Sequence, residues 1–274
     1  MMGMETLARE DGMGRPIIGI TGELEAARWG NWIREAVVSP VSYTRAVERA
    51  GGDAGYPAAG SREFRARADR RAQRLVLTSG RDVDPSLYDQ PPHAQTDVPD
   101  HRRDRFELIL TRAAIEADLP FLAVGRGMHI LNVARGGTLT QYLPDRVGSE
   151  SHKPDPVKLT THHLQLTRAS QLGRLLGDTA QVPAAHRQAI EGIGNGLLTV
   201  AWTADHVVEA IELPGHRWAV GVQWSPEDGD DPRLFETLVS IAARAAAAQA
   251  SVPARPEMTA RSKRAAKRQA ARSS

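Results

Sequence analysis

The sequence has no cysteine among its 274 residues. Disulfide bonds, thiolate metal ligands and a cysteine nucleophile are therefore excluded, because each of them needs a cysteine sulfur. Long apolar runs are missing as well: the hydrophobic segments have the length of buried strands, well short of the roughly 20 residues that cross a bilayer. The N-terminus also lacks the basic-then-apolar pattern of a signal peptide. We therefore expect a cytoplasmic protein with no membrane partner.

Acidic residues are scarce at the C-terminal end. Residues 251–274 contain seven arginines and lysines but one acid, Glu257, so this segment carries a net charge of +6. Because the whole chain carries +2, the remainder is mildly acidic at −4. With two prolines and few large apolar residues, the segment is predicted to be a disordered basic tail. Its charge would suit nucleic acid, but it has no aromatic residues to stack on bases, and we favour a solubilising role.

The rest of the chain has the composition of a soluble globular domain, with 41% hydrophobic and 25% charged residues. Residues 1–15 show no periodicity and are predicted to be a disordered lead-in, while residues 16–250 are predicted to form one domain. Strand-like runs there alternate with helix-like runs. The strands begin at Pro16, Arg74 and Pro120, and the helices cover residues 39–51, 104–117, 128–134 and 232–249. This alternation predicts an α/β fold, a three-layer αβα sandwich with a mostly parallel central sheet. Ligands bind such sheets at the carboxyl ends of the strands.

The first helix has signals at both ends. Ser39 is predicted to be its N-cap, Pro40 its first helical residue and Gly51 its stop. The second half of the domain is richer in strands, which are predicted in "VKLTTHHLQLT", "LLTVAWT", "VVEAIEL" and "WAVGVQW".

Four motifs follow predicted strands or lie near them. They are "LTSGRDVDPSLY" (77–88), "AVGRGMHILNVARGGTLTQ" (123–141), "PAAHRQAI" (183–190) and "GVQWSPE" (221–227). In order and spacing they resemble the class I glutamine amidotransferase superfamily, which has a flavodoxin-like fold. Within it they resemble the gamma-glutamyl-gamma-aminobutyrate hydrolase (peptidase C26) branch, which usually reads "LTGGxDVDPxxY", "GxCRGxQxxNVxxGGTLxQ", "NSxHHQAI" and "GVQWHPE". The resemblance covers nearly all of residues 16–245.

The resemblance implies a hydrolase of gamma-glutamyl amides. In that family a cysteine on a strained strand-to-helix turn is the nucleophile, a histidine activates it, and a glutamate orients the histidine. Matched residue by residue, the cysteine position holds Gly125, the histidine position holds Ser225, and only the glutamate, Glu227, is retained. We therefore expect a catalytically inactive or diverged member of the family, a pseudoenzyme with a regulatory or structural role.

Several neighbouring positions also depart from the family pattern. Ser79 stands where a glycine is usual, His129 replaces a glutamine, and Arg187 replaces a histidine. Together these changes are expected to remodel the pocket. The residues that the resemblance implies as ligand-binding candidates are Gly80, Arg126, Gly127, His129, Gln141, His186 and Gln188. We expect a small gamma-glutamyl or amino-acid-like ligand or a protein partner, a homodimer, and no cofactor.

Two alternatives remain open. The first is an active hydrolase with a non-cysteine nucleophile, in which Ser225 would need His186 or His129 within hydrogen-bond reach as its base. The second is a scaffold or nucleic-acid-associated protein that acts through the basic tail.

The candidate metal ligands do not indicate a metal site. Asp82 and Asp84 lie in "RDVDP", where aspartate before proline is ordinary turn chemistry. His162 and His163 are adjacent in a predicted strand, so their rings point to opposite faces, which is poor geometry for sharing one metal ion. His152 is interpreted as a loop or pocket-rim residue. We therefore predict that no metal is bound.

Overall fold

The structure is a computed structural model that describes residues 15–56, 74–155 and 157–250. The predicted lead-in, apart from Arg15, and the predicted basic tail lie outside the described residues. Within the described part, no helix combines the length and the apolar character needed to span a bilayer.

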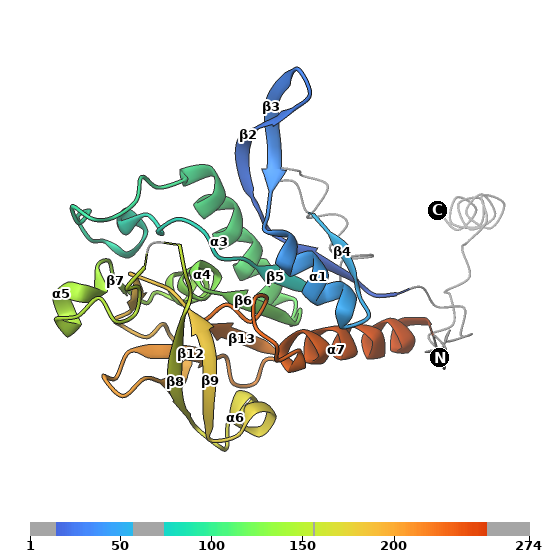
Figure 1. Cartoon of the computed structure of the whole chain (residues 1–274). Helices are drawn as coiled ribbons and strands as arrows, with labels where there is room; N and C mark the ends of the chain where they lie inside the picture. Colours follow the sequence, from blue (N-terminus) through green and yellow to red (C-terminus); the bar gives the residue numbers. More distant parts are fainter. Residues whose placement is uncertain (1–14, 57–73, 156, 251–274) are drawn as a thin grey trace, which may run out of the picture.

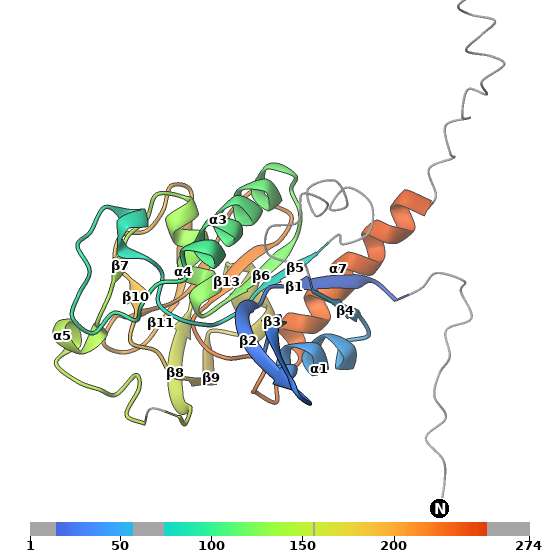
Figure 2. The same cartoon turned by 90° about the horizontal axis from the view of Figure 1, so that it is seen from above.

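A twisted sheet runs through the centre of the domain (Figures 1 and 2). Among the described residues it has nine strands, in the order β4-β1-β5-β6-β13-β12-β11-β8-β9. Neighbours from β4 to β13 are parallel, and neighbours from β13 to β9 are antiparallel. In sheet order, the strands are β4 (Asp53–Gly55), β1 (Ile17–Ile20), β5 (Leu75–Leu77), β6 (Phe121–Val124), β13 (Ala219–Val222), β12 (Val208–Glu212), β11 (Leu198–Trp202), β8 (Thr160–Leu166) and β9 (Thr179–Ala184).

Helices cover the parallel part of the sheet on both faces. Helices α1 (Val41–Arg49) and α7 (Arg233–Ala250) pack on one face, and α3 (His101–Glu116) and α4 (Arg126–Ala134) pack on the other (Figure 2). Strand β6 shows why: all four of its residues are buried, and they alternate between the two hydrophobic cores. A strand that is apolar on both sides needs cover on both sides. The predicted three-layer αβα fold is confirmed.

Smaller elements surround the three layers. A hairpin of β2 (Glu23–Trp29) and β3 (Trp32–Val38) projects from the body of the domain (Figure 1). The remaining elements are the 3-10 turn η1 (Pro85–Tyr88), the paired strands β7 (Leu139–Thr140) and β10 (Ala189–Ile190), and the short helices α5 (Leu143–Val147) and α6 (Gln171–Leu176).

Three predicted helix starts are wrong. Helix α4 begins at Arg126, two residues before the predicted Met128. Pro40, with ψ of 132°, lies outside α1 and is its N-cap, so Ser39 is one residue too early and its hydroxyl makes no capping bond. Helix α3 begins at His101, before the predicted Asp104, because the side chain of Asp100 accepts hydrogen bonds from the N–H groups of Arg102 and Arg103.

Candidate functional site

The site is built around the turn between β6 and α4. Gly125 has φ of 52° and ψ of −110°, a conformation that side-chain-bearing residues adopt only with strain. Its N–H donates to the carbonyl of Val222 on the neighbouring strand (2.7 Å), and its carbonyl accepts from the N–H groups of Met128 and His129. These bonds hold the turn in an elbow shape at the carboxyl end of the sheet although the residue there is glycine.

The space beside Gly125 is occupied by Ser79. A Cβ atom at position 125 would lie 2.6 Å from Ser79 Oγ, closer than Cβ atoms approach other atoms in proteins. The serine is held in place by Tyr43, whose hydroxyl donates to Ser79 Oγ (3.1 Å) and accepts from the Ser79 N–H (3.0 Å). Since Tyr43 is fully buried, this arrangement is fixed by the core. The serine hydroxyl therefore lies too close to this position for a side chain to be added at residue 125 unless Ser79 moves.

Ser225 and Glu227 lie across from the elbow, after β13. The N–H of Ser225 donates to the carbonyl of Pro183 (2.9 Å), which fixes its backbone. Burial raises the pKa of Glu227 to about 7, although hydrogen bonding to Tyr43 and Ser225 acts to lower it. Glu227 Oε2 is buried, and among the described residues it has no hydrogen-bond partner. The retained glutamate is thus a carboxyl group that is neutral in a large fraction of molecules near pH 7, where an exposed glutamate is ionised.

The two histidines that could serve as a base for Ser225 are engaged elsewhere. His129 Nε2 lies 2.8 Å from Gln223 Oε1, and burial lowers its pKa to about 4. His186 Nδ1 lies 2.9 Å from the carbonyl of Gln188, and its Nε2 faces His152 and Glu209. In the described part of the chain, no hydrogen bond connects Ser225 Oγ with either histidine.

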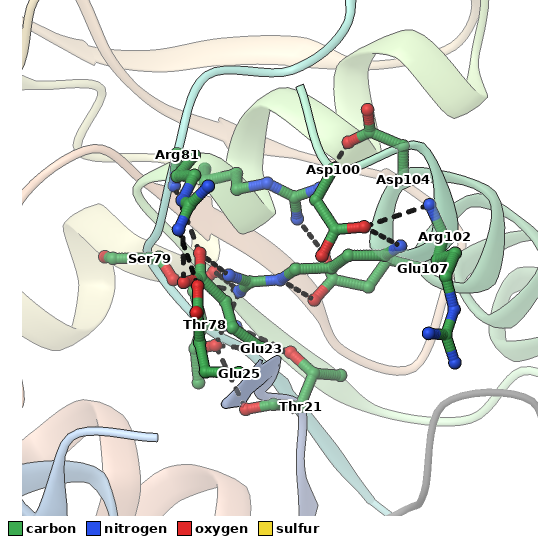
Figure 3. A network of polar contacts seen from close by, with 12 residues as sticks. Thr21, Glu23, Glu25, Thr78, Ser79, Arg81, Asp100, Arg102, Asp104 and Glu107 are labelled. Atoms are coloured by element: carbon green, nitrogen blue, oxygen red, sulfur yellow. Dashed lines mark hydrogen bonds and ion pairs between the residues drawn. The ribbon is translucent and has the colours of Figure 1, made fainter. Parts of the chain in front are cut away.

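A buried ionic network lies behind the elbow (Figure 3). Arg126 pairs with Asp104 and Glu107, and Arg103 Nε pairs with Glu107 Oε1 at 2.9 Å. Although burial acts to raise it, the pKa of Glu107 lies below its usual value because the two guanidinium groups face it. Arg103 also donates to the carbonyl of Ser79 (2.9 Å). The network therefore ties the loop after β5 to α3 and α4.

Two candidate glycines are required by close packing. A Cβ at Gly80 would lie 2.2 Å from the Arg103 guanidinium, and a Cβ at Gly127 would lie 2.5 Å from the carbonyl of Leu77. Close packing therefore explains why both positions hold glycine, without any ligand. The ion pairs with Asp104 and Glu107 likewise explain the buried charge of Arg126.

The two candidate glutamines differ in their hydrogen bonding. Gln141 is satisfied: its Oε1 accepts from the N–H of His93 and from Thr96 Oγ1, both at 2.8 Å, and its Nε2 donates to the carbonyl of Pro91 at 2.9 Å. Gln188 Oε1 accepts from the N–H of Val83 (3.3 Å), but its Nε2 is buried with no partner among the described residues. Gln188 is the candidate that still has a free donor.

Sequence reasoning missed a cluster of four buried side chains. His152, His162, His186 and Glu209 bring one nitrogen or oxygen each within 4.8 Å of one another. As predicted, His162 and His163 point to opposite faces of their strand: His162 is buried and His163 is exposed. The cluster went unnoticed because its members come from four segments and Glu209 stands out in no motif.

A second acidic group is less suited to a metal. Asp84, His101 and Asp104 lie close together, but Asp104 is paired with Arg126 and His101 is exposed. Asp84, which precedes Pro85, accepts from the N–H of Ser86 (2.9 Å), as expected for turn chemistry, whereas Asp82 accepts from the N–H of the more distant Asp97 (3.0 Å).

A surface groove of about 320 Å³ lies at helices α6 and α7. Its lining includes Leu175, Arg233, Glu236 and Ser240, and it contains none of the candidate site residues.

Comparison with known proteins agrees with this fold and identifies the family. The sequence model of the family described as Peptidase C26 matches residues 16–227. A "Putative glutamine amidotransferase" of Mycobacterium tuberculosis is 39% identical over 247 residues, which cover 89% of this chain and 80% of that protein. The gamma-glutamyl-gamma-aminobutyrate hydrolase of Escherichia coli O157:H7 is 31% identical over 153 residues, which cover 53% of this chain and 59% of the hydrolase.

A solved structure shows the same fold at low identity. The crystal structure of a "putative gmp synthase subunit a protein" from Thermoplasma acidophilum superposes with a TM-score of 0.59, covering 87% of this chain and all of that chain, at 13% identity. The family match over most of the domain, together with the elbow and the sheet order, shows that the chain is a glutamine amidotransferase-like member of the Peptidase C26 family.

Proposed function

We propose that this family member is a non-catalytic binding protein for a small gamma-glutamyl or other amino-acid-like compound. The observation that carries the proposal is the pair Ser79 and Gly125, because the serine hydroxyl lies 2.6 Å from the position that the Cβ of a nucleophile would take, too close for both atoms. A glycine alone would leave an empty position. A glycine with a half-buried serine beside it, hydrogen-bonded to the buried Tyr43, supports a site adapted to work without the nucleophile.

The replacement of the base supports the same proposal. Ser225 occupies the histidine position, and the nearby histidines are hydrogen-bonded to other groups. A serine hydroxyl needs a base within hydrogen-bond distance to become a nucleophile. The geometry therefore favours loss of the reaction over its transfer to Ser225.

Two polar atoms support a binding role. Gln188 Nε2 and Glu227 Oε2 are buried without partners among the described residues, and such groups cost about 1–3 kcal/mol each. A ligand with both an acceptor and a donor, such as the carboxylate and ammonium groups of an amino acid, would satisfy them. The E. coli relative is named for a gamma-glutamyl substrate, which suggests the first compounds to test.

The test measures binding and hydrolysis on the same sample. The full chain is titrated calorimetrically with glutamine and gamma-glutamyl-gamma-aminobutyrate, and release of ammonia or gamma-aminobutyrate is followed in parallel. We expect saturable binding with no release above the protein-free rate. Gln188→Met should weaken binding, whereas Gln165→Met, at an exposed position on β8, should not. Hydrolysis that disappears in Ser225→Ala would instead establish the serine hydrolase.

The expected homodimer, the protein partner, the cytoplasmic location and the role of the basic tail stay predictions.

A further inference from the structure

The buried histidine cluster lies in the antiparallel half of the domain. His162 comes from β8, Glu209 from β12, His186 from the segment between β9 and β10, and His152 from the loop after α5. All four side chains are buried. Four segments that are separated in the sequence therefore bring the nitrogen and oxygen atoms of these side chains together inside the protein.

The hydrogen bonds around the cluster set the protonation of two rings. His186 Nδ1 lies 2.9 Å from the carbonyl of Gln188, which can only accept, so this nitrogen carries a proton. His152 Nε2 lies 2.9 Å from Asp205 Oδ2, so it is the protonated nitrogen of that ring. In the neutral form of each ring, the other nitrogens, His186 Nε2 and His152 Nδ1, present lone pairs to the centre of the cluster.

These lone pairs face each other and a carboxylate. His152 Nδ1 lies 3.2 Å from His186 Nε2, and Glu209 Oε1 lies 3.7 Å from the first and 3.3 Å from the second. Three electron-rich atoms at these distances repel one another unless a proton or a metal cation lies between them. His162 Nδ1, at 2.8 Å from Glu209 Oε1, completes a set of four.

The spacing matches a tetrahedral metal site. Four ligand atoms at about 2.0–2.1 Å from a Zn²⁺ ion are separated from one another by about 3.3 Å. Four of the six separations among these atoms are 2.8, 3.2, 3.3 and 3.7 Å, which lie on both sides of that value. We propose that His152 Nδ1, His162 Nδ1, His186 Nε2 and Glu209 Oε1 bind one Zn²⁺ ion.

The ligand types favour zinc among the common cations. Calcium and magnesium prefer shells made entirely of oxygen, whereas imidazole nitrogens suit zinc and related transition metals. The site also has the outer hydrogen bonds that orient metal-binding histidines: Asp205 holds His152, and the Gln188 carbonyl holds His186.

The proposed site is structural. Four protein ligands complete a tetrahedral shell, and the site is buried, so no position is left for a reacting water. The ion would fasten the loop that carries His152 and the segment that carries His186 and Gln188 to strands β8 and β12. In a chain without cysteine, histidine and carboxylate are the side chains that could build such a site.

The test uses the full chain without a polyhistidine tag. The protein is treated with a chelator, dialysed and titrated with Zn²⁺ against a competing indicator. We expect one ion per chain, raised thermal stability on binding, and an affinity about 100-fold weaker or worse in His162→Asn. His163→Asn changes the exposed neighbour on the same strand and should bind zinc like the unmodified protein. Asp205→Asn should weaken binding by about 10–100-fold.

A spectroscopic measurement keeps the proposal testable if His162→Asn does not fold. Co²⁺ added to the chelator-treated, unmodified protein should give the intense visible absorption of a tetrahedral site, and zinc X-ray absorption should show three imidazoles and one oxygen. The proposal is overturned if the chelator-treated protein binds no zinc, if zinc does not stabilise it, or if the bound ion has a six-coordinate oxygen shell.

Discussion

A Cβ atom built at Gly125 lies 2.6 Å from Ser79 Oγ, and Ser79 itself is hydrogen-bonded to the buried Tyr43. The glycine and the serine thus depend on each other: the serine hydroxyl fits because position 125 has no side chain. Packing around position 125, and not only the missing cysteine, therefore disfavours a nucleophilic side chain there.

Gly125→Ala is expected to destabilise the protein by about 2–4 kcal/mol, from the positive φ and from the contact with Ser79. Adding Ser79→Gly should recover part of this loss, so the two changes will not be additive. Gly148→Ala is the matched control, because Gly148 has φ of +67° but no atom within 4 Å of its Cβ position. Urea denaturation of the unmodified protein, of Gly125→Ala, of Ser79→Gly, of the double variant and of the control measures the coupling, and strict additivity would contradict the packing argument.

Restoring the nucleophile alone should not restore hydrolysis. Gly125→Cys leaves Ser79 in the way and supplies no base, so we expect no turnover of gamma-glutamyl-gamma-aminobutyrate. The triple variant Gly125→Cys, Ser79→Gly, Ser225→His rebuilds the family pattern and should release gamma-aminobutyrate at a measurable rate. Turnover by the single variant would show that the serine does not block the site.

The stability of the protein should depend on the protonation of Glu227. Burial raises the pKa of this carboxyl group to about 7 in the folded protein, whereas an exposed glutamate titrates near pH 4.5. Between these values the folded state holds a proton that the unfolded state has released. The free energy of unfolding therefore falls as pH rises from about 4.5 to 7, by up to about 3 kcal/mol from this group.

Glu227→Gln removes this titration while preserving the shape of the side chain. The difference in unfolding free energy between the two proteins, measured by urea denaturation at several pH values, isolates the contribution of Glu227 from those of other groups. As pH rises, the unfolding free energy of the glutamine variant should increase relative to that of the unmodified protein. A difference that is constant across pH 4.5–7 would argue against the raised pKa.

Arg126 is expected to matter for stability because it is buried between Asp104 and Glu107. Removing one partner of a buried ionic group costs about 3–5 kcal/mol, so Arg126→Met should destabilise strongly. Arg102→Met breaks the exposed pair with Glu35 and should cost about 1 kcal/mol or less. Thermal and urea denaturation give both values, and similar costs for the two variants would refute the role assigned to the network.

Local patterns were enough to place most strands and helices. The runs at β1, β5 and β6 are continuously apolar, which requires cover on both faces and so implies the three-layer fold. The β2–β3 hairpin was not assigned, because its charged and apolar residues do not alternate cleanly and most of its surface is exposed. Its turn at Gly30, with φ of +57°, was the one available signal.

The sequence by itself determined that the elbow holds glycine and that cysteine chemistry is impossible, since both follow from which residues are present. It also determined that His162 and His163 face opposite ways, because neighbouring residues in a strand always do. Only the tertiary structure decided what each side chain meets. Ser79 follows β5 and lies beside Gly125, which follows the neighbouring parallel strand β6. His162 contacts Glu209, which is 47 positions away in the chain. The local sequence determines which face of a strand a side chain points to, but the order of the strands in the sheet determines which residue that side chain contacts.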